Sequence, residues 1–298
     1  LYNSLLVVAA PKRRWGMVSG IGVGVGYAGS LFTVGIFFAF GVDFEPLAIM
    51  IGAILFFVAA LPLFLFVPER PVSESRRGQP LKLMKPLKEL WAALKRLPEN
   101  RKLFLGLVGN FLCVDALNTL ILMMSTYVVN TVYAGSDVLD RPVQILMVGL
   151  IVSSIAWSFF NGWLSGKIGS IPALLFAGIM LGVAVLSGVL LVPWPITFMV
   201  VVVATGGAGL SGLWISGRKM VAELAPEEDR GAYFGLYGMT NKIGALSALV
   251  FATLTAFLPD LGVSEVTSYR FALAFLLVPV TAGSWLFARL VFEKAGDK

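Results

Sequence analysis

The chain has 298 residues, of which 58% are hydrophobic and only 13% are charged, and its formal net charge is +6. Soluble domains are about 45–50% apolar and about 25% charged, so this composition argues against an ordinary soluble protein and is typical of a membrane protein. The sequence has no histidine and a single cysteine, Cys113, in a hydrophobic run. These counts remove the commonest general base, the commonest metal ligand and any internal disulfide. We therefore expect no metal site and no cofactor.

Apolar runs long enough to cross a bilayer recur along the sequence. A helix needs about 20 residues to cross about 30 Å of hydrocarbon at about 1.5 Å per residue. The chain begins at Leu1 with a short apolar stretch, which we interpret as the tail of a helix cut off upstream. Eight complete spans are predicted after it, at 17–41, 46–67, 103–130, 144–165, 172–193, 196–217, 231–258 and 268–292. The predicted fold is all-α, a polytopic membrane protein that is truncated at its N-terminus.

Glycines in the first span fit the spacing G-x-G-x-x-G of a dinucleotide-binding turn, at Gly24, Gly26 and Gly29. That fingerprint needs a preceding strand and an aqueous site, and here it lies inside an uninterrupted apolar run. Two pairs of glycines, Gly20 with Gly24 and Gly22 with Gly26, recur instead at i, i+4. This repeat predicts a helix face that is bare enough for a neighbouring backbone to approach closely.

The basic residues indicate how the spans are oriented. If the long polar segment 69–102 is cytoplasmic, this segment and the other loops on its side of the membrane together hold 20 of the 23 Lys and Arg residues. This asymmetry follows the positive-inside rule, so the net charge reflects topology and anionic lipid more than nucleic-acid binding. We expect an integral, multi-pass protein in the plasma (inner) membrane, with 69–102 and the C-terminus in the cytoplasm.

The polar segment contains one amphipathic pattern. Leu87, Leu90, Trp91 and Leu94 recur at i, i+3, i+4 and i+7, with lysines opposite them. The pattern predicts a helix that lies in the cytoplasmic interface. A solvated linker helix remains the alternative.

Two ionisable residues fall near the middle of predicted spans, Asp115 and Lys242. A charge at the centre of a bilayer costs at least about 2.5–3.5 kcal/mol, so such residues mark interior paths or paired sites. Asn118 and Thr119 follow Asp115 at i+3 and i+4, on the same helix face. The three together offer a charge, an amide and a hydroxyl, which suits a zwitterionic or polyhydroxylated solute. Thr119 alone is a weak candidate, because a membrane-helix threonine commonly bonds its own i−4 carbonyl.

Two residues flank Lys242 on its own span. Asn241 directly precedes it, and Tyr237 lies a little more than one helical turn earlier. Tyr237 is either a site residue or a packed aromatic. The segment 218–231, which holds Arg218 and Arg230, is predicted to be a short cytoplasmic loop that could pair with basic residues near the first span as an inside gate.

Several stretches resemble known transporters. Six spans after a long basic loop are the layout of the C-terminal half of a major facilitator, and "GWLSGKIGS" resembles the loop motif of that superfamily, with Gly162, Lys167 and Gly169 matching. The usual acidic residue of the motif is replaced by Ser165 or Gly166. The stretches "YNSLLVVAAPKRRWGMVSGIGVGVGYAGS", "FLCVDALNTLILMMSTYV" and "SGRKMVAELAPEEDRGAYFGLYGMTNKIGA" resemble the unknown-major-facilitator, or vacuole-effluxer-like, family. The matching positions are Asn3, Ser19, Gly20, Gly26, Tyr27, Gly29, Asp115, Asn118, Thr119, Arg218, Pro226, Phe234, Gly235, Tyr237 and Lys242.

The resemblance implies a secondary active transporter that moves a small polar metabolite by alternating access, since fungal members of the family export amino acids from the vacuole. Residues 1–68 would be the end of the N-terminal bundle, 69–102 a cytoplasmic linker and 103–298 the C-terminal six-helix bundle. The first and fifth helices of such a bundle are neighbours, so we hypothesise that Asp115 and Lys242 form an ion pair or share a hydrogen-bond network. A buried pair that only orients two helices is the alternative.

The expected partners are a small-molecule substrate, the lipid bilayer and a coupling proton or cation, but no nucleic acid. A receptor or scaffold that has lost transport stays open as an alternative function. A membrane-embedded enzyme would need a nucleophile or metal constellation, and the sequence shows none. Where the chain reads Val114, Ala116 and "ALSALV", it departs from the family's pattern of an aromatic residue, a glycine and a Gly-Pro pair. These departures bear on the substrate more than on the fold.

Overall fold

The computed structural model describes residues 6–40, 45–66, 84–134, 140–243 and 246–296, and within these ranges it is helical with no strand. The helices are α1 (Leu6–Ala9), α2 (Trp15–Phe40), α3 (Glu45–Phe66), α4 (Met84–Arg96), α5 (Arg101–Asn130), α6 (Asp140–Ile168), α7 (Ser170–Leu190), α8 (Pro195–Leu224), α9 (Arg230–Ile243), α10 (Leu246–Asp260), α11 (Glu265–Phe275) and α12 (Leu277–Gly296), with short 3₁₀ turns η2 (Lys12–Arg14) and η5 (Leu97–Glu99).

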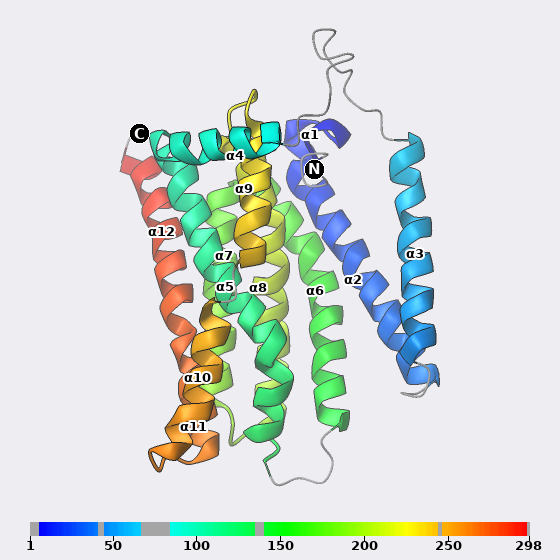
Figure 1. The fold of residues 1–298 in the computed structure, drawn as a ribbon, viewed down its shortest axis with the longest axis vertical. Helices are drawn as coiled ribbons and strands as arrows, with labels where there is room; N and C mark the ends of the chain where they lie inside the picture. The colour runs from blue at the N-terminus through cyan, green and yellow to red at the C-terminus, as the bar shows by residue number, and fades with distance from the viewer. Residues whose placement is uncertain (1–5, 41–44, 67–83, 135–139, 244–245, 297–298) are drawn as a thin grey trace.

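The long helices confirm the predicted class of membrane protein. Among the described residues, six candidate spans are long and apolar enough to cross a bilayer: Lys12–Gly35, Arg101–Asn130, Pro142–Ile168, Ser170–Leu190, Pro195–Leu224 and Glu265–Glu293. The described apolar parts of α3 and α10 are shorter, at Ile49–Pro62 and Leu246–Asp260. The long helices run side by side, and α4 lies across one end of them (Figure 1). We call this end the α4 end.

Two predicted boundaries differ from the structure. The span predicted at 231–258 is described as α9 up to Ile243 and as α10 from Leu246, and residues 244 and 245 between them lie outside the described residues. The span predicted at 196–217 continues as helix to Leu224, so the first half of the predicted loop 218–231 is the last part of α8. Both differences move charged residues to new surroundings, which the next subsection describes.

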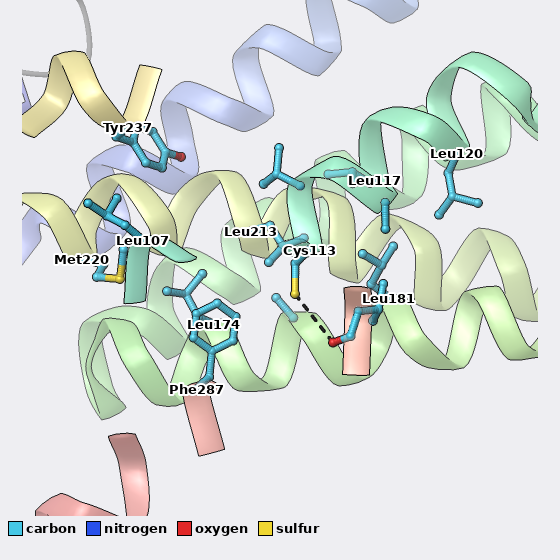
Figure 2. Close-up of a cluster of buried hydrophobic side chains, with 14 of the residues drawn as sticks. Leu107, Cys113, Leu117, Leu120, Leu174, Leu181, Leu213, Met220, Tyr237 and Phe287 are labelled. Atoms are coloured by element: carbon cyan, nitrogen blue, oxygen red, sulfur yellow. Dashed lines mark hydrogen bonds between the residues drawn. The ribbon is translucent and has the colours of Figure 1, made fainter. Parts of the chain in front are cut away.

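We call helices α1 to α3 the front part and helices α5 to α12 the rear bundle. The core of the rear bundle is formed by α5, α7, α8 and α12. Figure 2 shows its apolar side chains, which include Leu107 and Leu117 from α5, Leu213 from α8 and Phe287 from α12. Cys113 is fully buried among them, and its thiol lies 3.8 Å from the Val280 carbonyl oxygen. Cys113, which the sequence places in a hydrophobic run, is therefore a small core residue.

Helix α2 contacts the rear bundle through glycine. A Cβ atom at Gly20 would lie 2.6 Å from the Ser158 carbonyl oxygen and 2.9 Å from the Cα of Gly162, both on α6. Gly16 lies equally close to Gly162, and Gly24 lies close to Ser158, so three glycines one turn apart form the contact. The close approach of a neighbouring backbone is confirmed at Gly20, whereas the nearest atoms at Gly24 belong to the side chains of Ser158 and Phe159. The other predicted pair, Gly22 and Gly26, has nothing within 4 Å of the position that a Cβ would take.

We expect Gly20→Ala to destabilise the protein by about 1–3 kcal/mol, because its methyl group would overpack the backbone of α6. Gly22→Ala is the matched control on the same helix. It should leave stability unchanged or raise it slightly, because alanine favours the helix and the site is open. Thermal unfolding in detergent measures both variants, and equal shifts would contradict the assigned contact.

Candidate functional site

Asp115 on α5 caps the N-terminus of α10. Its carboxylate accepts the backbone N–H of Leu246 at 2.8 Å and that of Ser247 at 3.2 Å, and it also accepts the Ser247 hydroxyl. The Asp115 residue is only 4% exposed. The first N–H groups of a helix have no partner within the helix and carry partial positive charge. A buried carboxylate and an open helix end thus satisfy each other.

Lys242 lies on the other side of the same junction. It is in the last turn of α9, where the orphan carbonyls make the helix end negative. Its side chain is exposed, whereas that of Asp115 is buried. Asp115 therefore lies at the positive N-terminus of α10, and Lys242 lies at the negative C-terminus of α9.

The structure differs here from the hypothesis of an ion pair. Among the described residues, which include both partners, Asp115 and Lys242 form no ion pair. Instead, the Asp115 oxygens accept from the N-terminus of α10, and the side chain of Lys242 is exposed. What the two residues share is their position beside the α9–α10 junction.

The other predicted site residues have varied surroundings. The Thr119 hydroxyl donates to the carbonyl of Asp115 at 2.9 Å, the local bond expected of a membrane-helix threonine. Asn118 is half-buried on α5, and Asn241 lies on α9 with its side chain outside the described part. Tyr237 is fully buried within the core cluster and is labelled in Figure 2.

Tyr237 has a polar neighbour that the sequence analysis missed. A Cβ atom at Gly217 of α8 would lie 2.7 Å from the Asn110 Oδ1 atom and 2.9 Å from the Tyr237 hydroxyl. Both polar atoms, from α5 and α9, therefore converge on one point beside α8. Only glycine leaves room for them there.

A buried ion pair at the α4 end was also missed. Lys219 is 3% exposed, and its ammonium lies 2.9 Å from Glu223 Oε1, one turn further along α8. The ammonium also donates to the carbonyl oxygen of Ser165, near the end of α6. The other oxygen of Glu223 accepts the hydroxyl of Ser170, the first residue of α7, at 2.5 Å. One ion pair on α8 thus contacts two other helices.

The polarity of this pair matches the helix ends that it contacts. The C-terminus of α6 is negative and receives the ammonium of Lys219, whereas the N-terminus of α7 is positive and lies next to Glu223. The two helices are joined at Gly169, whose φ of 96° favours glycine. The loop motif in this chain lacks its usual acid, and Glu223 supplies an acidic group to the same turn from α8. We call the Lys219–Glu223 pair and its two contacts the α8 clamp.

The remaining motif residues are distributed around the α4 end. Gly162 is a packing position against α2, as described above, and Lys167 lies 5.0 Å from the ring centroid of Trp163. Arg218 is helical and donates to the carbonyl of Trp214 at 3.1 Å. Arg230 begins α9 and lies 5.9 Å from the ring of Trp15 at the start of α2.

The structure has other contacts at the place where we predicted a gate between basic residues near the first span and segment 218–231. Asp229 pairs with Arg96 of α4 at 3.3 Å, and Glu227 pairs with Arg230 at 3.4 Å. Contact with the start of α2 is made by the cation–π pair of Arg230 and Trp15. A cation over an aromatic ring therefore bridges the front and rear parts where an ion pair was predicted.

An apolar cavity of about 280 Å³ lies among α2, α5, α6, α7 and α8. Leu117, Leu120 and Leu146 contribute to its lining, and Ser125 is the one polar side chain among its described lining residues. The cavity suits the apolar part of a small solute and offers no ligands to a metal. In the described ranges, no three His, Cys, Asp or Glu side chains gather at one place.

Comparisons with known proteins agree with this architecture. A family model described as "Vacuole effluxer Atg22 like" matches residues 10–295. The uncharacterized MFS-type transporter YxiO of Bacillus subtilis (strain 168) is 25% identical over 271 residues, which is 86% of this chain and 60% of the relative. The chain therefore spans about 60% of the length of this curated relative. The predicted resemblance to major facilitators of the vacuole-effluxer-like kind is confirmed.

The α8 clamp makes a prediction for stability. Lys219→Met and Glu223→Gln should each destabilise the protein, by up to about 3–5 kcal/mol for the more buried Lys219→Met change, because each leaves one partner without its counter-charge. The double variant Lys219→Met/Glu223→Met should be closer to the wild type. The charge-swapped double variant should be the less stable of the two doubles, because both charges would then oppose the helix ends. Thermal unfolding of the four variants tests this order, and full stability of the swapped variant would contradict it.

Proposed function

Because the chain belongs to the family described as vacuole effluxer Atg22 like, we propose that it is part of a secondary active transporter that moves a small polar metabolite by alternating access. Amino acids are the substrate class that we favour. The proposal concerns the full-length protein, since the chain spans about 60% of its curated relative.

The observation that carries the proposal is the contact of the buried Asp115 carboxylate with the backbone N–H groups of Leu246 and Ser247, within the span predicted at 231–258. Transporters commonly build their sites from discontinuous helices, whose half-helix ends offer backbone groups and partial charges to substrates and ions. Backbone N–H groups that bind a buried carboxylate within a predicted span therefore support a transport site more than a structural one.

The charges at this junction favour a zwitterionic solute. Asp115 offers a carboxylate to an ammonium group, and Lys242, four residues before Leu246, offers an ammonium to a carboxylate. Asn118 lies on α5 with Asp115, and Asn241 directly precedes Lys242 on α9. Tyr237 and Thr119 support the helices from the core side. The apolar cavity begins at Leu117, two residues beyond Asp115 on α5. An amino acid, which combines two charges with a side chain, fits this combination better than a sugar does.

Asp115 also provides a route for coupling. When it is ionised, its two oxygens accept from Leu246 and Ser247. A proton on the carboxylate would remove the charge that the helix end favours and would occupy one acceptor position. Protonation or cation binding at Asp115 would thus loosen α10 from α5, and this change would be linked to the opening of one side of the membrane. A coupling proton or cation is part of the proposal.

The orientation of the bundles is proposed on the distribution of basic residues. The α4 end would face the cytoplasm from the plasma (inner) membrane, with residues 1–68 as the end of the N-terminal bundle, 69–102 as the linker and 103–298 as the C-terminal bundle. Arg230 with Trp15, Arg218 and the turn that contains Lys167 and Gly169 would close this end during the cycle. Reagents that label cysteine from one side of the membrane would test the orientation.

The central experiment is flux of radiolabelled solutes into proteoliposomes that contain the full-length protein, with and without a pH gradient. Uptake of an amino acid that accumulates against its gradient supports the proposal. Binding of a solute without flux would favour the alternative of a receptor that has lost transport. Chemical conversion of the solute without translocation would favour an enzyme.

Asp115→Asn should abolish gradient-driven accumulation, because an amide has one acceptor oxygen and no charge to exchange. Thr119→Val is the matched control, since Thr119 is buried on the same helix and its hydroxyl bonds only local backbone. This variant should keep at least half of the wild-type rate. Flux assays on both variants measure the difference, and normal accumulation by Asp115→Asn would exclude Asp115 as the coupling group.

The charge-swapped variant Asp115→Lys/Lys242→Asp separates two kinds of interaction. A direct ion pair would be restored by the swap, and transport would return. The capping geometry predicts no recovery, because a lysine would face the positive N-terminus of α10 and an aspartate the negative C-terminus of α9. Flux through the double variant, with expression and monodispersity matched to the wild type, decides between the two.

A further inference from the structure

Helix α4 is anchored to the bundle along one edge. Ala93 and Leu97 are buried, and the side chain of Leu90 lies 2.8 Å from the position that a Cβ would take on Gly235 of α9. Arg96 on a neighbouring edge pairs with Asp229. These contacts set the rotation of α4 about its own axis, so the directions of its remaining side chains are defined.

The turn from α4 to α5 fixes its depth. Asn100, at the end of η5, accepts the N–H of Leu103 at 3.2 Å and donates to the Leu224 carbonyl at 3.0 Å. The candidate span of α5 starts at the next residue, Arg101. Helix α4 therefore lies crosswise at the level where the spanning helices α5 and α8 end (Figure 1). In a bilayer this level is the layer of lipid headgroups.

A second edge of α4 has no partner in the described part of the chain. Trp91 is 60% exposed and Leu94 is 45% exposed. Lys88 and Lys95 are also exposed, and they lie three residues before and four residues after Trp91, which places them beside it on the helix surface. The ammonium of Lys95 is 5.7 Å from the centre of the Trp91 ring. We call these four residues the outer flank.

The outer flank combines apolar surface with unbalanced positive charge. Neither Lys88 nor Lys95 takes part in an ion pair among the described residues, whereas Arg96 on the anchored side does. A helix that carries tryptophan and leucine next to lysines partitions into the interface and is attracted to anionic lipid. Lysines extend their aliphatic stems along apolar surface and keep the ammonium among headgroups.

We propose that the outer flank of α4 is a binding surface for anionic phospholipid, with Trp91 and Leu94 inserted at the acyl boundary and Lys88 and Lys95 on the lipid phosphates. The anchored edge would transmit this contact to α9 through Gly235 and to the α8–α9 turn through Asp229. The proposal is independent of the transported solute and of transport itself.

A depth-dependent fluorophore tests the proposal in the full-length protein. Cys113 is the one cysteine of this sequence and is fully buried, so within this chain a thiol introduced at Leu94 is the accessible labelling site. Any cysteines outside this chain would first be replaced by serine. The label is an environment-sensitive dye on Leu94→Cys, in liposomes that contain brominated phosphatidylglycerol or brominated phosphatidylcholine at equal fractions. The matched control is Glu89→Cys, which is exposed on the same helix but points about 160° away from Trp91 at about 100° per residue.

The dye at position 94 should be quenched by brominated phosphatidylglycerol at lower lipid fractions than by brominated phosphatidylcholine, and the dye at position 89 should be quenched by neither. Lys88→Gln and Lys95→Gln should each raise the phosphatidylglycerol fraction at half-maximal quenching by about fivefold, and the double variant should remove the preference. Equal unfolding temperatures of all variants establish that these changes are local.

Three results would overturn the proposal. Absence of quenching at position 94 by either lipid would mean that protein or water covers the flank. Equal quenching by the two lipids would mean apolar contact without recognition of charge. Quenching that changes with the protein-to-lipid ratio would mean that a second copy of the protein covers the flank.

Discussion

The bond between Asp115 and the N-terminus of α10 is the constraint on which the middle of this protein depends. A helix that begins inside the membrane leaves N–H groups without partners, and hydrocarbon offers no water to satisfy them. A carboxylate in the same place is equally unfavourable when it stands alone. Each group supplies what the other lacks, so the N-terminus of α10 and the buried acid are stable only together.

The same principle recurs at the α4 end. The ammonium of Lys219 lies at the closing turn of α6 and Glu223 lies at the opening turn of α7. In both places the charges contact the ends of helices other than their own. Charges arranged in this way respond to a change in the relative position of helices, because a shift of one helix end alters the field at the side chain. The polar groups of the rear bundle are therefore suited to detect and to guide motion between helices.

Much of the architecture was predictable because it follows from the length of apolar runs. The long spans, the all-helical class, the core position of Cys113 and the glycine contact of α2 all depend on periodicity and composition, which are local properties. The contact of Asp115 with the start of α10 was not predictable in the same way. The stretch "ALSALV" contains good helix formers, and the acceptor for the new helix end comes from α5, 131 residues earlier than Leu246.

The surroundings of single charges were also beyond the sequence. Arg218 and Lys219 are adjacent, and a basic pair at the end of an apolar run predicts the start of a loop. In the folded protein α8 continues for five residues beyond Lys219, and the two side chains point to different neighbours. A glutamate one turn after the lysine was the available signal, because an i, i+4 pair favours continuation of a helix. The hypothesis of an ion pair between Asp115 and Lys242 differs from the structure for a related reason. The partners of Asp115 are backbone N–H groups, which the charged residues of a sequence do not indicate.

The contact of α2 with α6 has a mechanical consequence. Backbone atoms of Gly16 and Gly20 lie directly against those of Ser158 and Gly162, so this seam contains few side chains that interlock. Helices joined by interdigitated side chains must change rotamers before they can slide or tilt against each other. A contact of backbone on backbone lacks such interdigitated side chains. The front and rear parts can therefore roll along it while the axes of α2 and α6 stay close together.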